Sequence, residues 1–183
     1  GNFGNITAGM MGKRMGIPIH QFIASTNLND IVPTYLKTGN YKPKPSVQTI
    51  SNAMDVGDPS NIHRILDMYG SVKSIQKDIC SWSFEDNATR EQILSTLKEC
   101  KYLLDPHSAV GLLGLDNYID QINKDYNSIF LGTAHPVKFK DIIEPVIKSK
   151  IDIPEKLGKI MNKEKQSVYM KNNYEDFSNY LLS

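Results

Sequence analysis

The first twenty-five residues restrict the fold more than any other stretch of this sequence. They open with the loop Gly1-Asn2-Phe3-Gly4-Asn5, continue with apolar residues at helical spacing over 6–15, and close with the apolar, β-branched stretch 17–25. A loop, a helix, a glycine stop at Gly16 and a buried strand form one half of a βαβ unit. The sequence therefore predicts an α/β fold with an open, mostly parallel sheet flanked by helices.

The opening loop, residues 1–5, is also the first candidate site. Glycine adopts positive φ without a Cβ clash, and asparagine tolerates the left-handed region better than most residues. Such a loop can direct several N–H groups at one point, where the following helix adds about half a positive charge. A phosphate group is the natural ligand. The alternative is an ordinary turn and helix cap, because the loop matches neither a Walker A sequence nor the G-x-G-x-x-G dinucleotide pattern.

The rest of the chain alternates between helical and extended patterns. Two further strands are expected, at 81–85 and at 128–133, and the second should be fully buried. The segment 41–60, with three prolines, is expected to be a long irregular excursion. Helices are expected over 31–36, 61–69, 72–79, 90–101, 107–122, 136–148, 155–161 and 174–182.

Three further stretches place polar residues where ligands often bind. Gly132-Thr133-Ala134-His135-Pro136 follows the strand predicted at 128–133, and ligands of α/β sheets lie beyond the carboxyl ends of strands. The alternative there is that Thr133 caps the next helix and His135 lies on the surface. Asp105 to Val110 favours a capped helix start over a site. Ser51 to Val56 is either a substrate loop or a surface excursion, and its spacing does not decide between them.

The composition limits the classes of partner. The 183 residues are 40% hydrophobic and 22% charged, which is typical of a soluble globular chain. The 21 basic and 20 acidic residues leave a net charge of +1, so neither nucleic acid nor an anionic membrane is expected as a partner. Cys80 and Cys100 match no metal-ligand spacing and are typical of free thiols in a cytoplasmic protein. No metal is expected.

Five motifs, in this order, resemble the threonine synthase family in its longer-chain branch. The resemblance covers residues 1 to about 155, and the tail after Met161 adds nothing to it. The motifs are Gly-Asn-Phe-Gly-Asn at 1–5, Lys-Arg-Met-Gly-Ile-Pro-Ile at 13–19 with Ala-Ser-Thr-Asn-Leu-Asn-Asp at 24–30, Ser-Asn-Ala-Met-Asp-Val at 51–56 with Pro-Ser-Asn at 59–61, Asp-Pro-His-Ser-Ala-Val at 105–110, and Phe-Leu-Gly-Thr-Ala-His-Pro-Val-Lys-Phe at 130–139.

The resemblance implies a fold, a reaction and a cofactor. Residues 1–160 would be the C-terminal part of a fold type II α/β domain that binds pyridoxal 5′-phosphate, and 161–183 a tail with a short helix. The reaction would be a lyase step of threonine biosynthesis, from O-phospho-L-homoserine and water to L-threonine and phosphate. The cofactor-binding residues that it implies are the backbone amides of Gly1, Asn2, Phe3, Gly4 and Asn5 for the cofactor phosphate, and the Thr133 hydroxyl for the pyridine nitrogen.

One departure from the family limits the catalytic assignment. The family's Schiff-base lysine lies upstream of the phosphate loop, in a Phe-Lys-Asp context, and nothing in this chain is expected to match it. Lys13, Lys37 and Lys138 belong to other motifs. The expectation is therefore a C-terminal portion that is inactive alone and whose partner is the N-terminal part of the same protein. The alternatives are a related phospho-lyase with another substrate, and a truncated, non-catalytic binding module.

Overall fold

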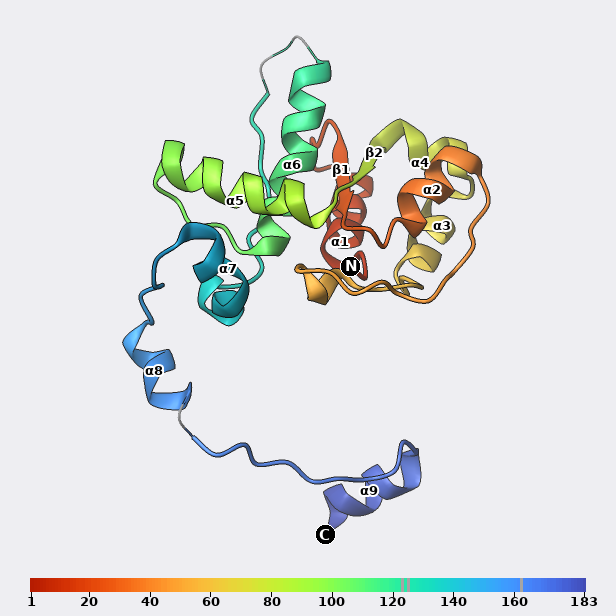
Figure 1. The fold of residues 1–183 in the computed structure, drawn as a ribbon. Coiled ribbons are helices and arrows are strands. Elements are labelled where there is room, and N and C mark those ends of the chain that lie inside the picture. The colour runs from red at the N-terminus through yellow and green to blue at the C-terminus, as the bar shows by residue number, and fades with distance from the viewer. Residues whose placement is uncertain (123, 125, 162) are drawn as a thin grey trace. The chain divides into compact units, whose positions relative to one another are not determined.

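The structure, a computed structural model, describes residues 1–122, 124, 126–161 and 163–183. Two units can be separated, 1–151 and 152–183. The second contains α8 (Glu155–Met161) and α9 (Tyr174–Leu182), neither of which has a buried residue. The first contains, in chain order, α1 (Gly4–Arg14), β1 (Phe22–Thr26), α2 (Ile31–Thr38), the 3-10 helix η1 (Asn52–Met54), α3 (Ile62–Tyr69), α4 (Val72–Asp78), β2 (Ile79–Ser83), α5 (Asp86–Cys100), α6 (Pro106–Gln121), the 3-10 helix η2 (Pro136–Phe139) and α7 (Lys140–Ile147) (Figure 1).

The two strands of the first unit pair in parallel. Phe22 lies opposite Ile79 and Thr26 lies opposite Ser83. Parallel neighbours need a long crossover between them, and here α2, α3 and α4 supply it. The α/β class and the parallel pairing predicted from the opening residues are confirmed.

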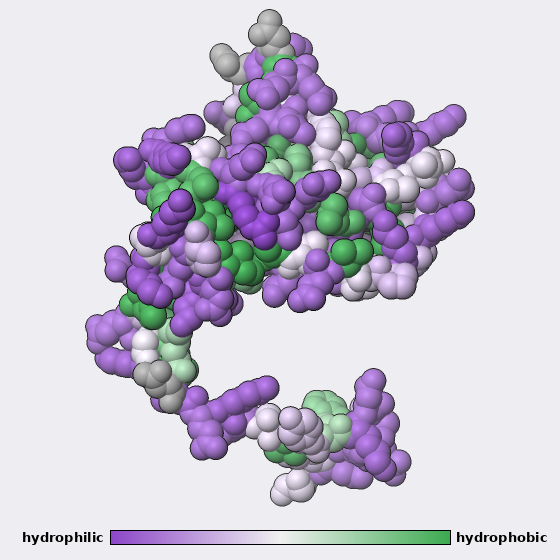
Figure 2. Space-filling view, viewed as in Figure 1, coloured by the Kyte–Doolittle hydropathy of each residue, from purple (hydrophilic) through white to green (hydrophobic). Residues whose placement is uncertain are grey.

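Helices cover both faces of this sheet, as parallel strands require. Ala24 of β1 belongs to a core that α1, α2, α3 and α4 share, whereas Ser25 faces α6 on the opposite side (Figure 1). Beyond α6, a second core joins α5, α6 and α7, and Figure 2 shows hydrophobic side chains gathered around α5 and α7. The buried members of the first core are Met10, Ala24, Val32, Tyr35, Leu36, Ile62, Ile65, Ile75 and Ile79, and those of the second are Ile93, Leu104, Ala109 and Ile143.

All three strand predictions differ from the structure, and the strand expected at 81–85 lies at Ile79–Ser83. The strand expected at 17–25 begins only at Phe22, because the Ile17 amide donates back to the Gly12 carbonyl and the chain turns there. The buried strand expected at 128–133 is wrong: this segment has no regular structure, and Ile129 is 83% exposed. An apolar run predicts burial without specifying a partner, and none of the described residues forms a strand beside it.

None of the helices in the described part of the chain has the length and apolar content that a membrane span requires.

The contact between α6 and β1 makes a testable prediction about stability. A Cβ on Gly114 would lie 1.8 Å from Ser25 Oγ and 3.2 Å from Ile23 Cγ2, whereas a Cβ on Gly111 would meet nothing within 4 Å. Gly114→Ala should therefore lower the free energy of unfolding by about 1–3 kcal/mol through overpacking. Gly111→Ala, in the same helix, should raise it by up to about 1 kcal/mol. Urea unfolding of both variants measures the difference, and equal effects would contradict the close approach.

Candidate functional site

The opening loop leads directly into α1. This helix begins at Gly4 rather than Ile6, so Gly4 and Asn5 belong to its first turn. The left-handed residue is Phe3, with φ 60° and ψ 19°, and not one of the glycines or asparagines. A left-handed non-glycine residue costs free energy, which the packing of the Phe3 side chain against the first core offsets. The loop therefore has one fixed orientation.

The N-terminus of α1 presents hydrogen-bond donors that nothing in the described chain uses. Thr7 donates both its amide and its hydroxyl to the Phe3 carbonyl, at 3.0 and 2.7 Å. For the N–H groups of Gly4, Asn5 and Ile6, the described residues supply no acceptor, and α1 has neither a side-chain cap nor an acidic residue in its first turn. Three unpaired donors at the positive end of a helix fit an anion such as a phosphate.

The start of α3 holds the opening loop in place. The Asn2 side-chain oxygen accepts from the Ser60 amide at 2.6 Å and from the Ser60 hydroxyl at 3.0 Å. The Asn61 side-chain amide donates to the Asn2 carbonyl at 2.8 Å. Ser60 and Asn61 belong to the motif at 59–61, but the sequence predicted no role for either residue. Their contacts show that the Asn2 side chain anchors the loop.

Buried amides fix the turn that contains η1. The Asn27 side-chain amide donates to Thr49 Oγ1 at 2.7 Å, to Ser51 Oγ at 3.0 Å and to Asp55 Oδ1 at 2.8 Å. The Asn29 side-chain amide donates to the same Asp55 oxygen at 3.0 Å and to the Asn27 side-chain oxygen at 2.9 Å. Asn27 and Asn29 are almost fully buried. The motif after β1 therefore determines the position of the motif at 51–56.

Asp105 is the N-cap of α6, as the sequence predicts for this helix start. The buried carboxylate accepts from the His107 amide at 2.9 Å, from the His107 ring at 2.8 Å and from the Ser108 hydroxyl. Burial raises the pKa of Asp105, but the hydrogen bonds from His107 and Ser108 outweigh it and hold that pKa below its usual value. The other ring nitrogen, His107 Nε2, accepts from the Ala53 amide in η1 at 3.1 Å. No sequence pattern pointed to this last contact.

The motif at 130–139 lies against the start of α6. A Cβ on Gly132 would lie 3.6 Å from Ser108 Oγ, and the rings of His107 and Phe139 are 4.7 Å apart. Thr133 is exposed, and within the described chain its hydroxyl makes no hydrogen bond. His135 is also exposed, and its Nδ1 accepts from the Val137 amide at 3.2 Å, so His135 rather than Thr133 caps η2.

These contacts connect residues of all five motifs. The opening loop lies against η1, because a Cβ on Gly1 would be 3.6 Å from the Ala53 carbonyl and from Met54 Cα. Asn27, after β1, binds Asp55 at the end of η1, and His107 binds the Ala53 amide within η1. The segment that contains Thr133 then follows along the start of α6. Residues predicted from separate motifs therefore form a connected arrangement.

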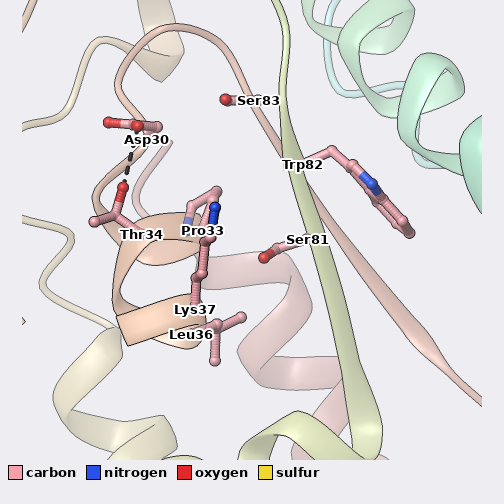
Figure 3. Close-up of a pocket in the computed structure, with 8 residues that line it drawn as sticks. All are labelled: Asp30, Pro33, Thr34, Leu36, Lys37, Ser81, Trp82 and Ser83. Carbon is pink, nitrogen blue, oxygen red and sulfur yellow. Dashed lines mark hydrogen bonds between the residues drawn. The ribbon is translucent and has the colours of Figure 1, made fainter. Parts of the chain in front are cut away.

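A groove of about 580 Å³ lies elsewhere, between α2 and β2 (Figure 3). Figure 3 shows Asp30 and Thr34 joined by a hydrogen bond and Ser81 pointing toward α2, while Trp82 projects from the other face of β2. Asp30 is the only one of its lining residues that belongs to the five motifs. The groove is therefore separate from the opening loop.

The Phe-Lys-Asp context requires a correction. The chain does contain this tripeptide, at Phe139-Lys140-Asp141, directly after the fifth motif. Lys140 is the first residue of α7 and stands downstream of the opening loop, whereas the resemblance to the family implies a cofactor lysine upstream of it. A three-residue match is too short to outweigh its place in the chain, so Lys140 is not assigned to that role.

Comparisons with known proteins agree with the motifs. The family model described as "Threonine synthase, C-terminal" matches residues 108–181. Threonine synthase of Haemophilus influenzae is 41% identical over 182 residues, which cover 100% of this chain and 42% of that protein. The crystal structure of threonine synthase from Escherichia coli matches with a TM-score of 0.85 and 35% identity, over 100% of this chain and 42% of that one. Threonine synthase from Brucella melitensis, solved with PLP bound, matches with a TM-score of 0.83 and 29% identity, over 99% of this chain and 44% of that one.

This chain thus spans less than half the length of each of these relatives. Sequence identity along the whole chain, a shared fold and a matching C-terminal family model agree with one another. The chain belongs to the threonine synthase family, and its similarity is to the C-terminal part of that family's proteins.

Proposed function

We propose that this chain forms the phosphate-binding side of a threonine synthase that converts O-phospho-L-homoserine and water into L-threonine and phosphate with pyridoxal 5′-phosphate. The observation that carries the proposal is the set of unpaired N–H groups at Gly4, Asn5 and Ile6, where the loop that matches the family's phosphate motif passes into α1. A related protein of known structure was solved with PLP bound, which supports the choice of cofactor.

The opening loop would hold the cofactor by its phosphate. The backbone of Gly1 to Asn5 is fixed by the contacts of Asn2 with Ser60 and Asn61, so its amides are oriented before the anion arrives. Preorganised donors at a helix N-terminus bind an anion without the cost of ordering a flexible loop. The helix dipole adds to the attraction. The loop would therefore position the cofactor and not react with it.

Thr133 would tune the cofactor ring from the other end. When bound, the cofactor supplies the electron withdrawal that the reaction needs, and the protein orients it and adjusts its electronics. The Thr133 hydroxyl is neutral, so it can hydrogen-bond the ring nitrogen without stabilising a proton there as a carboxylate would. We propose that this moderate withdrawal favours loss of the γ-phosphate and addition of water at Cβ over competing reactions.

The covalent anchor of the cofactor would lie outside residues 1–183. Lys13 donates to Asp78 at 2.8 Å and to the His20 carbonyl at 3.0 Å, which engages it in the packing of α1. Lys37 lies in α2, outside the five motifs, and Lys138 lies in η2, in a motif that carries no anchor in the family. Residues 1–183 alone would therefore be inactive, and the N-terminal part of the family's proteins would complete the site.

A product assay tests this function. The complete gene product, loaded with cofactor, should release L-threonine and inorganic phosphate in equal amounts from O-phospho-L-homoserine, and isolated residues 1–183 should release neither. A different amino-acid product from a panel of phosphorylated substrates would assign a related phospho-lyase instead. Failure to bind the cofactor at all would identify a non-catalytic module.

The role of Thr133 makes a spectroscopic prediction. Thr133→Asp places a carboxylate at the ring nitrogen and should raise the protonation of that nitrogen, because an anion stabilises the adjacent cation. The absorbance of the bound cofactor should shift and by-products should appear, whereas Thr133→Ser should behave like the natural protein. Absorbance spectra and product analysis of the complete gene product measure both effects. Unchanged spectra and products in the Asp variant would rule out this role.

A further inference from the structure

We propose that Asp105 and His107 are a positioning pair that holds η1 against the opening loop and thereby sets the geometry of the phosphate site. The effect on the phosphate rests on the proposed function, whereas the contact between His107 and η1 does not. Asp105 and His107 come from the start of α6, and Ala53, which His107 contacts, is 54 residues away in the chain. The pair would act through the turn and touch neither cofactor nor substrate.

The partners of the ring define which nitrogen carries the proton. The Asp105 carboxylate is almost fully buried and faces His107 Nδ1 at 2.8 Å, so Nδ1 is the donor. The Ala53 amide can only donate, and it points at Nε2 at 3.1 Å, so Nε2 is the acceptor. Both contacts require the same neutral tautomer, which Asp105 therefore selects.

The ring has little freedom to move away from Ala53. His107 is 9% exposed, and its ring lies 4.7 Å from that of Phe139. The Asp105 carboxylate is itself held by the His107 amide at 2.9 Å and by the Ser108 hydroxyl. His107 Nε2 is thus held in one position, where it accepts from the Ala53 amide.

The turn at η1 connects His107 with the opening loop. It is closed by hydrogen bonds from the Met54 amide to the Ser51 carbonyl at 2.8 Å and from the Asp55 amide to the Asn52 carbonyl at 3.1 Å. Gly1 rests against Ala53 and Met54. Although Ala53 is exposed, its amide donates a hydrogen bond to the buried ring of His107. Loss of that hydrogen bond would free η1, against which the opening loop packs.

Two substitutions at His107 separate positioning from simple core packing. A glutamine amide oxygen falls near the position of Nε2 and can accept from Ala53, whereas an asparagine amide falls near Nδ1 and reaches only Asp105. Both replacements reduce the packing against Phe139. Asp105→Ala serves as an independent variant, because it removes the oxygen that accepts from Nδ1 and leaves neither tautomer selected.

The test measures hydrogen exchange at the Ala53 amide and the affinity for pyridoxal 5′-phosphate, both in the complete gene product. His107→Asn and Asp105→Ala should each speed the exchange at Ala53 and weaken cofactor binding by at least about tenfold, while His107→Gln should stay within about threefold of the natural protein. Exchange is measured without cofactor, so it tests the contact even if the natural protein binds no cofactor, which would refute the proposed function alone. Equal effects of Asn and Gln at His107, or unchanged exchange in Asp105→Ala, would overturn the proposal.

Discussion

Gly4→Asp is expected to weaken the binding of pyridoxal 5′-phosphate to the complete gene product by at least about 100-fold. The N–H of Gly4 is one of three unpaired donors at the start of α1, so a carboxylate there would lie close to the bound phosphate. Two unit charges 4 Å apart repel by about 4 kcal/mol at an effective dielectric constant of 20. A 100-fold loss corresponds to about 2.8 kcal/mol and is therefore a conservative expectation.

The matched control for this prediction is Gly4→Asn, which has the same shape without the charge. A Cβ on Gly4 would meet only the Asn61 side-chain amide, at 3.8 Å, so neither side chain forces the loop to move. Binding to the Asn variant should stay within about threefold of the natural protein. Fluorescence titration of protein freed of its cofactor measures each affinity. If the Asp and Asn variants bind equally well, the phosphate does not lie at this end of α1.

Asp55→Ala is expected to lower the free energy of unfolding by at least about 3 kcal/mol. The Asp55 carboxylate accepts from the side-chain amides of Asn27 and Asn29 at 2.8 and 3.0 Å, and from the Thr49 amide and hydroxyl at 3.0 and 2.8 Å. Hydrogen bonds to a charged group contribute about 1.5–3 kcal/mol each, and buried donors left without a partner add a desolvation cost. Several contacts are lost together, so the expected sum is large.

The control for Asp55→Ala is a substitution at Asp58, in the same irregular segment, 41–60. Asp58 is exposed and, among the described residues, accepts one hydrogen bond, from the Tyr41 hydroxyl at 2.6 Å, so Asp58→Ala should cost about 1 kcal/mol or less. Urea unfolding of both variants gives the comparison. A loss below about 1 kcal/mol for Asp55→Ala would show that the turn at η1 does not depend on this network.

Local chemistry explains which parts of the structure were predictable from sequence. The cap of α6 involves Asp105 and the amide two residues later, so its spacing is visible in the chain itself. The parallel pairing of β1 with β2 follows from the helix before β1, which is followed by a glycine, and from the helical crossover after β1. Both depend on residues that are close in sequence or on a strong repeating pattern.

The remaining features depend on contacts between distant residues. The bond from Ala53 to His107 and the exposure of Ile129 follow from where other elements lie, which no local pattern records. The left-handed conformation of Phe3 was missed for a similar reason, since core packing outweighs its intrinsic preference. The motifs could therefore be found from sequence, but the way in which η1 and His107 connect them could not.

A crystal structure of the complete gene product with pyridoxal 5′-phosphate bound is the most direct test of the proposed site. The phosphate oxygens should lie about 2.7–3.2 Å from the backbone nitrogens of Gly4, Asn5 and Ile6. The Thr133 hydroxyl should lie within the same range of the pyridine nitrogen. A phosphate bound elsewhere, with these three amides left to solvent, would contradict the assignment of the opening loop.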